Sequence, residues 1–110
     1  MKDFYDLYYI AGVYYIDGRE LQEAVFQTLQ RRGTAYGRDT LERIRGLVRD
    51  ANVQSRWSRF SRRTLGLDVS LEEVMDRVCG FLQPVFDAIV DERELFGTWD
   101  PQERWYMSAP

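Results

Sequence analysis

The chain has no histidine and only one cysteine, Cys79, among its 110 residues. Histidine is the commonest metal ligand and the side chain that titrates near neutral pH, so its absence excludes histidine-ligated metal sites and histidine-dependent catalytic triads. One cysteine cannot form an internal disulfide, which is typical of a protein of the reducing cytoplasm. Any chemistry must therefore use carboxylates, arginine, tyrosine, the one lysine or a bound Mg²⁺.

Long apolar runs are also absent. No segment approaches the roughly 20 apolar residues that a membrane-spanning helix needs, and the first residues have neither the basic leader nor the apolar core of a signal peptide. With 45% hydrophobic and 15% aromatic residues, the chain can still build a core of its own. We therefore expect a cytoplasmic protein with a single core.

The net charge of −3 conceals three bands of different sign. Residues 31–67 hold ten arginines and three acidic residues, a net charge of +7, whereas residues 1–30 carry −3 and residues 68–110 carry −7. A basic middle between acidic flanks is typical of a surface that faces phosphate. The alternative, that the bands neutralise one another inside a helical bundle, stays open.

Apolar residues recur with helical spacing along most of the chain, and no segment alternates with the period of a strand. The spacing predicts helices over residues 2–16, 18–32, 40–50, 53–64 and 71–93. We therefore expect an all-α fold, a compact bundle of five to six helices over residues 1–95. Residues 96–110 are predicted to form an irregular aromatic tail that packs back on the bundle or on a neighbouring domain.

Local signals mark several helix ends. Asp17 is expected to cap the second helix and Gly33 to end it, while Asn52 is expected to cap the fourth. Ser70 and Glu73 have the spacing of a capping box at the start of the last helix. Pro84 should kink or split that helix near residues 80–84.

Two carboxylates, Asp3 and Asp6, lie three residues apart in the first predicted helix and therefore on one face. Such a pair can bind Mg²⁺ or position a hydroxyl group, and Lys2 could contact a phosphate as a point charge. The alternative interpretation is that these are ordinary acids at a helix start, where they favour the helix dipole, beside a solvated lysine.

Four arginines cluster on the fourth predicted helix, around Trp57 and Phe60: Arg56, Arg59, Arg62 and Arg63. Arginines interleaved with aromatic rings can bind nucleic acid by phosphate contact and stacking. The two aromatic residues fall on the apolar stripe, however, so we expect them to pack in the core and leave the arginines as a possible RNA-binding set. Cys79 lies between core positions and is expected to be inert.

The segment Lys2-Asp3-Phe4-Tyr5-Asp6-Leu7 resembles the Lys/Arg-Asp-x-Tyr/Phe-Asp motif of the AbiEii/AbiGii family of nucleotidyltransferase toxins. Residues 22–33, 57–60 and 81–84 are similar to later helices of that family. The resemblance implies a toxin of bacterial type IV-like toxin–antitoxin or abortive-infection systems, with a cognate antitoxin, Mg²⁺, a nucleoside triphosphate and, for some members, transfer to the 3′ end of tRNA.

The resemblance also implies roles for the motif residues. Asp3 would act as a base or organise the nucleotide site, Asp6 would support it, and Lys2 would face phosphate. The Gly-Ser motif and the metal-binding Asp-x-Asp pair of the family's N-terminal half do not occur in this sequence. We therefore expect the C-terminal helical part of such an enzyme, inactive without its partner half; the alternative hypothesis is a stand-alone helical module that binds protein or nucleic acid without catalysis.

Overall fold

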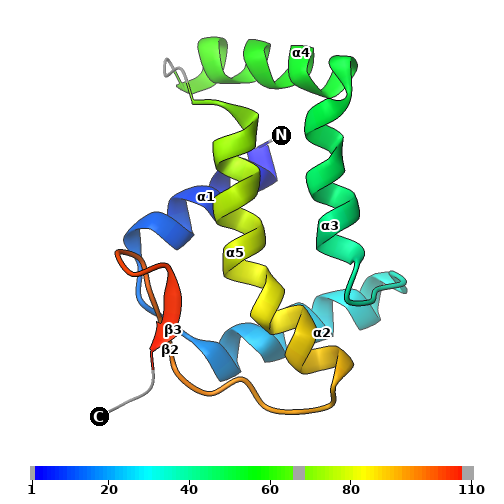
Figure 1. The fold of residues 1–110 in the computed structure, drawn as a ribbon, viewed down its shortest axis with the longest axis vertical. Helices are drawn as coiled ribbons and strands as arrows, with labels where there is room; N and C mark the ends of the chain where they lie inside the picture. The colour runs from blue at the N-terminus through cyan, green and yellow to red at the C-terminus, as the bar shows by residue number, and fades with distance from the viewer. Residues whose placement is uncertain (1, 66–68, 108–110) are drawn as a thin grey trace.

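In this computed structural model, residues 2–65 and 69–107 are described, with side chains for all of them except Lys2, Asp3, Thr64 and Leu65. The prediction of a mostly helical bundle is confirmed (Figure 1). The elements, in chain order, are α1 (Lys2–Val13), β1 (Ile16–Asp17), α2 (Gly18–Arg32), α3 (Thr40–Arg45) with a 3₁₀ extension η1 (Gly46–Arg49), α4 (Ala51–Phe60) with a π-helical extension η2 (Ser61–Leu65), α5 (Leu71–Val90), β2 (Thr98–Asp100) and β3 (Trp105–Met107).

Helix α5 is the centre of the fold, and α1, α2 and α3 all pack on it. Ser70 begins the helix as predicted, because its hydroxyl accepts a hydrogen bond from the Glu73 N–H at 3.1 Å. Pro84 does not split it: the carbonyl that Pro84 leaves unbonded belongs to Gly80, which is exposed and can be hydrated. Figure 1 shows the axis of α5 turning between its two halves.

The remaining helix ends agree with the sequence in part. Helix α2 starts and ends as predicted, with the Asp17 carboxylate accepting from the Glu20 N–H and Gly33 in the left-handed conformation. The predicted cap Asn52 is wrong: Asp50 caps α4, and its carboxylate accepts from the N–H groups of Asn52 and Val53 at 2.8 and 3.2 Å. Both residue types cap helices well, so spacing alone did not distinguish them.

The tail departs from the irregular structure that the sequence predicted. Strands β2 and β3 form an antiparallel hairpin, and β2 also pairs with β1, so that Ile16, Trp99 and Tyr106 lie side by side across the sheet. Helix α1 consequently ends at Val13 rather than at residue 16. Strands of two or three residues are too short for a period-two pattern to be recognised.

Long-range hydrogen bonds fasten the tail, and the residues just before it, to the helices. The Gln22 amide of α2 donates to the Arg93 carbonyl at 2.7 Å and accepts from the Leu95 N–H at 2.8 Å. The Trp99 indole donates to the Ala11 carbonyl at 2.8 Å, and the Tyr106 hydroxyl donates to the Phe81 carbonyl at 2.6 Å. The tail therefore connects α1, α2 and α5 rather than lying on their surface.

No helix within residues 2–65 and 69–107 combines the length and the apolar character needed to cross a membrane.

The buried Tyr106 hydroxyl predicts a loss of stability in alkali. Burial raises the pKa of this phenol well above its ordinary value of 10.0. The unfolded chain therefore releases this proton at a lower pH than the folded protein does. The contribution of the buried hydroxyl to the free energy of unfolding is complete below pH 10 and is lost as the pH rises toward the folded-state pKa. We expect the free energy of unfolding, measured by urea titration, to fall above pH 10 and to fall less steeply in Tyr106→Phe. An equal slope in both proteins would contradict this assignment.

Candidate functional site

The motif predicted from the sequence lies in the first turns of α1. The backbone of Lys2 and Asp3 belongs to this helix, but their side chains lie outside the described residues. The Asp6 side chain is exposed and lines a shallow hollow of about 380 Å³ with Tyr5, Tyr9 and Ile10. The structure therefore places one of the three motif side chains, and it places it at the surface.

A series of tyrosine rings leads away from Asp6 along α1. The ring of Tyr9 lies with its centroid 6.5 Å from that of Tyr5 and 6.4 Å from that of Tyr14. Tyr9 and Tyr14 are 48% and 52% exposed. The motif carboxylate thus stands at one end of an exposed aromatic surface.

Arg77 of α5 fixes the opposite face of α1. Its guanidinium carbon lies 3.9 Å from the centroid of the Tyr8 ring, and Nη1 donates to the Tyr8 carbonyl at 3.4 Å. Gly12 leaves the space for this arrangement, because a Cβ there would lie 2.3 Å from Nη1 of Arg77. Among the described residues, the Nε of Arg77 is buried without a hydrogen-bond partner, while the guanidinium stacks on Tyr8 and Nη1 bonds to the Tyr8 carbonyl.

The Tyr8 hydroxyl belongs to the same cluster. Burial raises the pKa of this phenol; the Arg77 charge opposes the shift, while the charge and hydrogen bond of Glu73 add to it. Tyr8 is therefore a neutral packing residue between α1 and α5 at ordinary pH.

Helix α4 and its extension present the predicted arginines. Arg56, Arg59 and Arg63 line one hollow of about 420 Å³ with the half-buried ring of Phe60, and Arg62 is exposed without lining it. Trp57 is buried, as the sequence predicted. Within the described part of the chain, no carboxylate lies at ion-pair distance from these four arginines.

Helix α4, which carries the predicted arginines, and the start of α1 lie at the same end of α5. The Trp57 indole donates to the Val69 carbonyl at 2.5 Å, which fixes α4 just before α5 begins. Tyr8 of α1 packs against Arg77, two turns into α5. Ala11, further along α1, accepts a hydrogen bond from Trp99 of β2, so the C-terminal end of α1 lies toward the sheet. The first turn of α1 therefore lies toward the N-terminal end of α5, beneath α4 (Figure 1).

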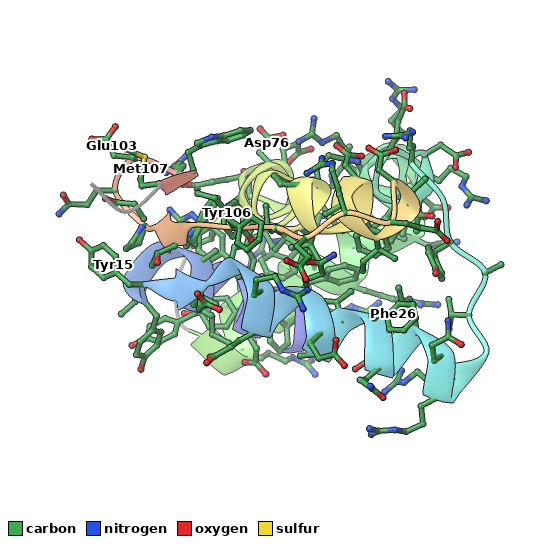
Figure 2. The ribbon with its side chains drawn as sticks, turned by 90° about the horizontal axis from the view of Figure 1, so that it is seen from below. Tyr15, Phe26, Asp76, Glu103, Tyr106 and Met107 are labelled. Carbon is green, nitrogen blue, oxygen red and sulfur yellow. The ribbon has the colours of Figure 1, made fainter. Side chains whose placement is uncertain are left out.

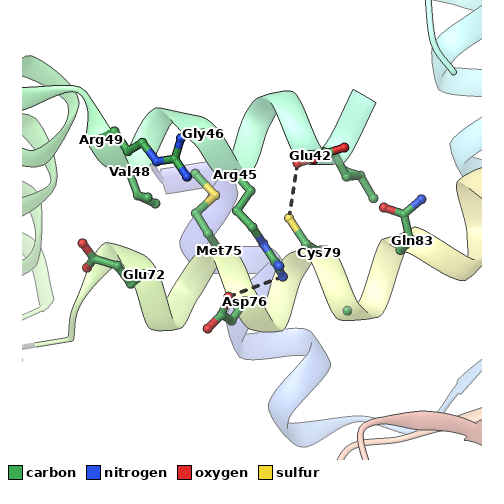
Figure 3. Close-up of a pocket in the computed structure, with 12 residues that line it drawn as sticks. Glu42, Arg45, Gly46, Val48, Arg49, Glu72, Met75, Asp76, Cys79 and Gln83 are labelled. Carbon is green, nitrogen blue, oxygen red and sulfur yellow. Dashed lines mark hydrogen bonds and ion pairs between the residues drawn. The ribbon is translucent and has the colours of Figure 1, made fainter. Parts of the chain in front are cut away.

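A further groove, of about 730 Å³, runs between α3 with η1 and α5 (Figure 3). Arg45 crosses it to Asp76, with Nη2 and Oδ1 3.4 Å apart. The thiol of Cys79 lies buried at its floor and donates to the Leu41 carbonyl at 3.7 Å, and burial raises its pKa. Cys79 thus packs in the core as predicted, and none of the predicted site residues lines this groove.

Comparison with protein families decides the assignment. Residues 1–92 match the family described as nucleotidyl transferase AbiEii toxin of type IV toxin–antitoxin systems. The chain belongs to this family. No curated protein and no solved structure matched the chain.

Membership of the AbiEii family relates the chain to type IV toxin–antitoxin systems, in which a toxin is paired with an antitoxin. All site residues predicted from the sequence lie within the AbiEii match, whereas the hairpin of residues 98–107 lies beyond it. In the described ranges, no group of three or more acidic or cysteine side chains is placed to hold a metal ion.

Sequence reasoning missed two features of the site. It did not anticipate that the rings of Tyr9, on α1, and of Tyr14 and Tyr15, which follow α1, are exposed. It also overlooked Arg77, although a single arginine within the apolar sequence of α5 is a recognisable signal. Neither the exposure of a ring nor the partner of a lone cation follows from helical periodicity.

The position of the Arg77 guanidinium against Gly12 predicts that substitutions at these two residues have non-additive effects on stability. Alanine in a helix ordinarily stabilises by about 0.5–1 kcal/mol relative to glycine, but at residue 12 it would displace Arg77. We expect Gly12→Ala to destabilise the protein by about 1 kcal/mol and to become stabilising in an Arg77→Ala background, measured by urea unfolding as a double-mutant cycle.

A matched control is available on α5. Gly80→Ala meets no atom within 4 Å and should stabilise the protein in both backgrounds. Additive effects of Gly12→Ala and Arg77→Ala would show that the guanidinium does not occupy this space.

Proposed function

We propose that this chain is the helical C-terminal part of a type IV toxin nucleotidyltransferase that acts on tRNA. The family match over residues 1–92, which includes the opening motif, carries the proposal. It is supported by the common location of that motif and the arginines of α4 at one end of α5. In this proposal one end of the bundle meets the nucleotide and the RNA acceptor together, and an antitoxin opposes the toxin.

The motif on α1 would line the nucleotide site from its C-terminal side. By resemblance to the family, Asp3 acts as a base or organises the site, Asp6 supports it, and Lys2 faces phosphate. The exposure of Asp6 supports this role, since a carboxylate at the surface of the chain can meet a site on another domain. Mg²⁺ and the nucleoside triphosphate would be held mainly by the nucleotidyltransferase half, and we derive no step through them.

Helix α4 would receive the RNA. Arg56, Arg59 and Arg63 follow one another at spacings of three and four residues and share one hollow with Phe60. Arginine forks pair with phosphate oxygens, and an aromatic ring beside them can stack on a splayed base. This arrangement suits the single-stranded 3′ end of tRNA better than a duplex, because the unpaired bases are free to stack.

The alternative is a stand-alone module that binds a protein or a nucleic acid without catalysis. Such a module would be expected to cover the apolar residues of its first helix. The exposed rings of Tyr9 and Tyr14 weigh against it, since they leave an aromatic surface beside the motif.

Neutralising the arginine set predicts a specific loss of RNA binding. We expect Arg59→Gln with Arg63→Gln to weaken the binding of deacylated tRNA about ten-fold at low salt, because each arginine releases counterions from the RNA. The slope of log affinity against log salt should become shallower by about 1.4. Filter binding across a salt series measures both.

The matched control removes the same charge elsewhere. Arg31→Gln with Arg32→Gln neutralises two exposed arginines at the end of α2 and should change affinity and slope much less. Equal losses of affinity in the two double variants would show that only the net charge of the protein matters. Unchanged affinity in the α4 variant would show that α4 does not bind the RNA.

The proposal also predicts that the chain alone is not a transferase. With Mg²⁺, labelled nucleoside triphosphates and tRNA, we expect no labelled tRNA on a denaturing gel, because the sequence has no Gly-Ser motif and no Asp-x-Asp pair. A complete member of the family serves as the positive control. Clear labelling by this chain would show that its own residues suffice for catalysis.

A further inference from the structure

Three arginines of α4 and its extension share one hollow instead of being spread around the helix. We name this feature the arginine hollow, lined by Arg56, Arg59, Phe60 and Arg63. Their spacing is i, i+3, i+4 and i+7, which places side chains on one side of a helix. Arg62, one residue before Arg63, is exposed but lies outside the hollow. The hollow thus gathers three of the four predicted arginines at one place.

The aromatic floor of the arginine hollow is fixed by the core. The half-buried ring of Phe60 lies with its centroid 5.6 Å from that of Trp57. Trp57 is 2% exposed, and its indole donates to the Val69 carbonyl at 2.5 Å. Phe60 is therefore held in place before any ligand arrives, which lowers the ordering cost of binding.

The charge around the arginine hollow has one sign. Residues 51–67 contain four arginines and no acidic residue in the sequence. A guanidinium group presents a planar fork of N–H donors, which matches the oxygens of a phosphate group and forms charge-assisted hydrogen bonds with them. The three arginines of the hollow are exposed, so their forks can meet a ligand from solvent. The chemistry that fits is a phosphate group with several free oxygens.

The size of the hollow and the charge of its ligand favour a terminal phosphate over the chain of an RNA strand. Its volume is about 420 Å³, near the lower end of the roughly 300–1,000 Å³ of ligand pockets, so it holds one nucleotide-sized group. An internal phosphodiester carries a single negative charge. A terminal phosphate monoester carries about −1.5 to −2 and three acceptor oxygens at one point. Three arginines around one hollow match the terminal group better.

We infer that the arginine hollow binds the 5′-terminal phosphate of the RNA, an inference that rests on the proposed function and extends it. An RNA that accepts a nucleotide at its 3′ end needs a free 3′ hydroxyl there, so its terminal phosphate is at the 5′ end. In an acceptor stem the 5′ nucleotide is paired next to the unpaired 3′ segment. A contact between the 5′ phosphate and α4 therefore brings the 3′ segment to the same end of the bundle as the motif on α1.

The charge of the sheet supports this orientation of the RNA. Asp17 and Asp100 lie on β1 and β2, and Glu103 lies in the turn between β2 and β3. The sheet is distant from α4 (Figure 1), and Figure 2 shows Glu103 and Met107 at this end of the molecule. Carboxylates repel phosphate whereas arginines attract it. The field of the protein thus directs the most highly charged end of the RNA to α4.

The test compares a tRNA that carries a 5′ monophosphate with the same tRNA after phosphatase treatment, by filter binding at low salt. Wild-type protein should bind the phosphorylated tRNA about ten-fold more tightly, because dephosphorylation removes charge-assisted hydrogen bonds. Arg63→Gln should reduce this preference to about two-fold or less, since the residue and the phosphate interact directly. Arg62→Gln is the matched control: it removes the same charge one residue away, outside the hollow, and should keep the preference. Urea midpoints verify that each variant is folded.

Four results would overturn the inference. Equal binding of the two RNAs by wild-type protein, with affinity still lost in Arg59→Gln with Arg63→Gln, would reject the 5′ phosphate and leave the RNA contact of α4 standing. So would a preference that Arg63→Gln keeps or that Arg62→Gln loses equally. Displacement of the phosphorylated tRNA by ATP from wild-type protein but not from Arg63→Gln would assign the hollow to the triphosphate of a free nucleotide. Binding of neither RNA would reject the proposed function as well.

Discussion

Burial of the apolar face of α5 is the interaction on which the other elements depend. Eleven of its twenty residues are buried, and α1, α2 and α3 have no larger apolar surface to pack against. None of these shorter helices would be stable by itself in water, because isolated helices of this length are marginal. The positions of the motif on α1 and the arginines on α4 are therefore consequences of where α5 begins and which face it buries.

Polar contacts convert this packing into a defined arrangement. Apolar burial is not directional, so it would allow α1 to slide or rotate on α5. Arg77 stacked on Tyr8, Gly12 beneath its guanidinium and the Trp99 indole bonded to the Ala11 carbonyl each specify one position of α1. Helix α1, which carries the motif, is thus positioned by groups distributed over α5 and the hairpin, far from it in sequence.

The two ends of the bundle differ in charge and in chemistry. The arginines of α4 occupy one end without described acidic partners, whereas the exposed rings of Tyr15 and Trp105 lie next to β1 and on β3, near Asp17 and Asp100. The charge bands of the sequence are therefore not neutralised throughout the bundle, although Arg45 with Asp76 and Arg38 with Asp91 do pair across bands.

The sequence by itself determined the helices, most of their caps and the family, because helical periodicity, capping residues and a short motif are local properties. Trp57 in the core and the arginines around it also followed from the spacing. Only the tertiary structure decided the pairing of β1 with the tail and the position of Arg77 over the Tyr8 ring. It also decided the exposure of Tyr9, Tyr14 and Trp105. The contacts behind these features join residues 69 to 88 positions apart, and no local pattern encodes which distant group a side chain will meet.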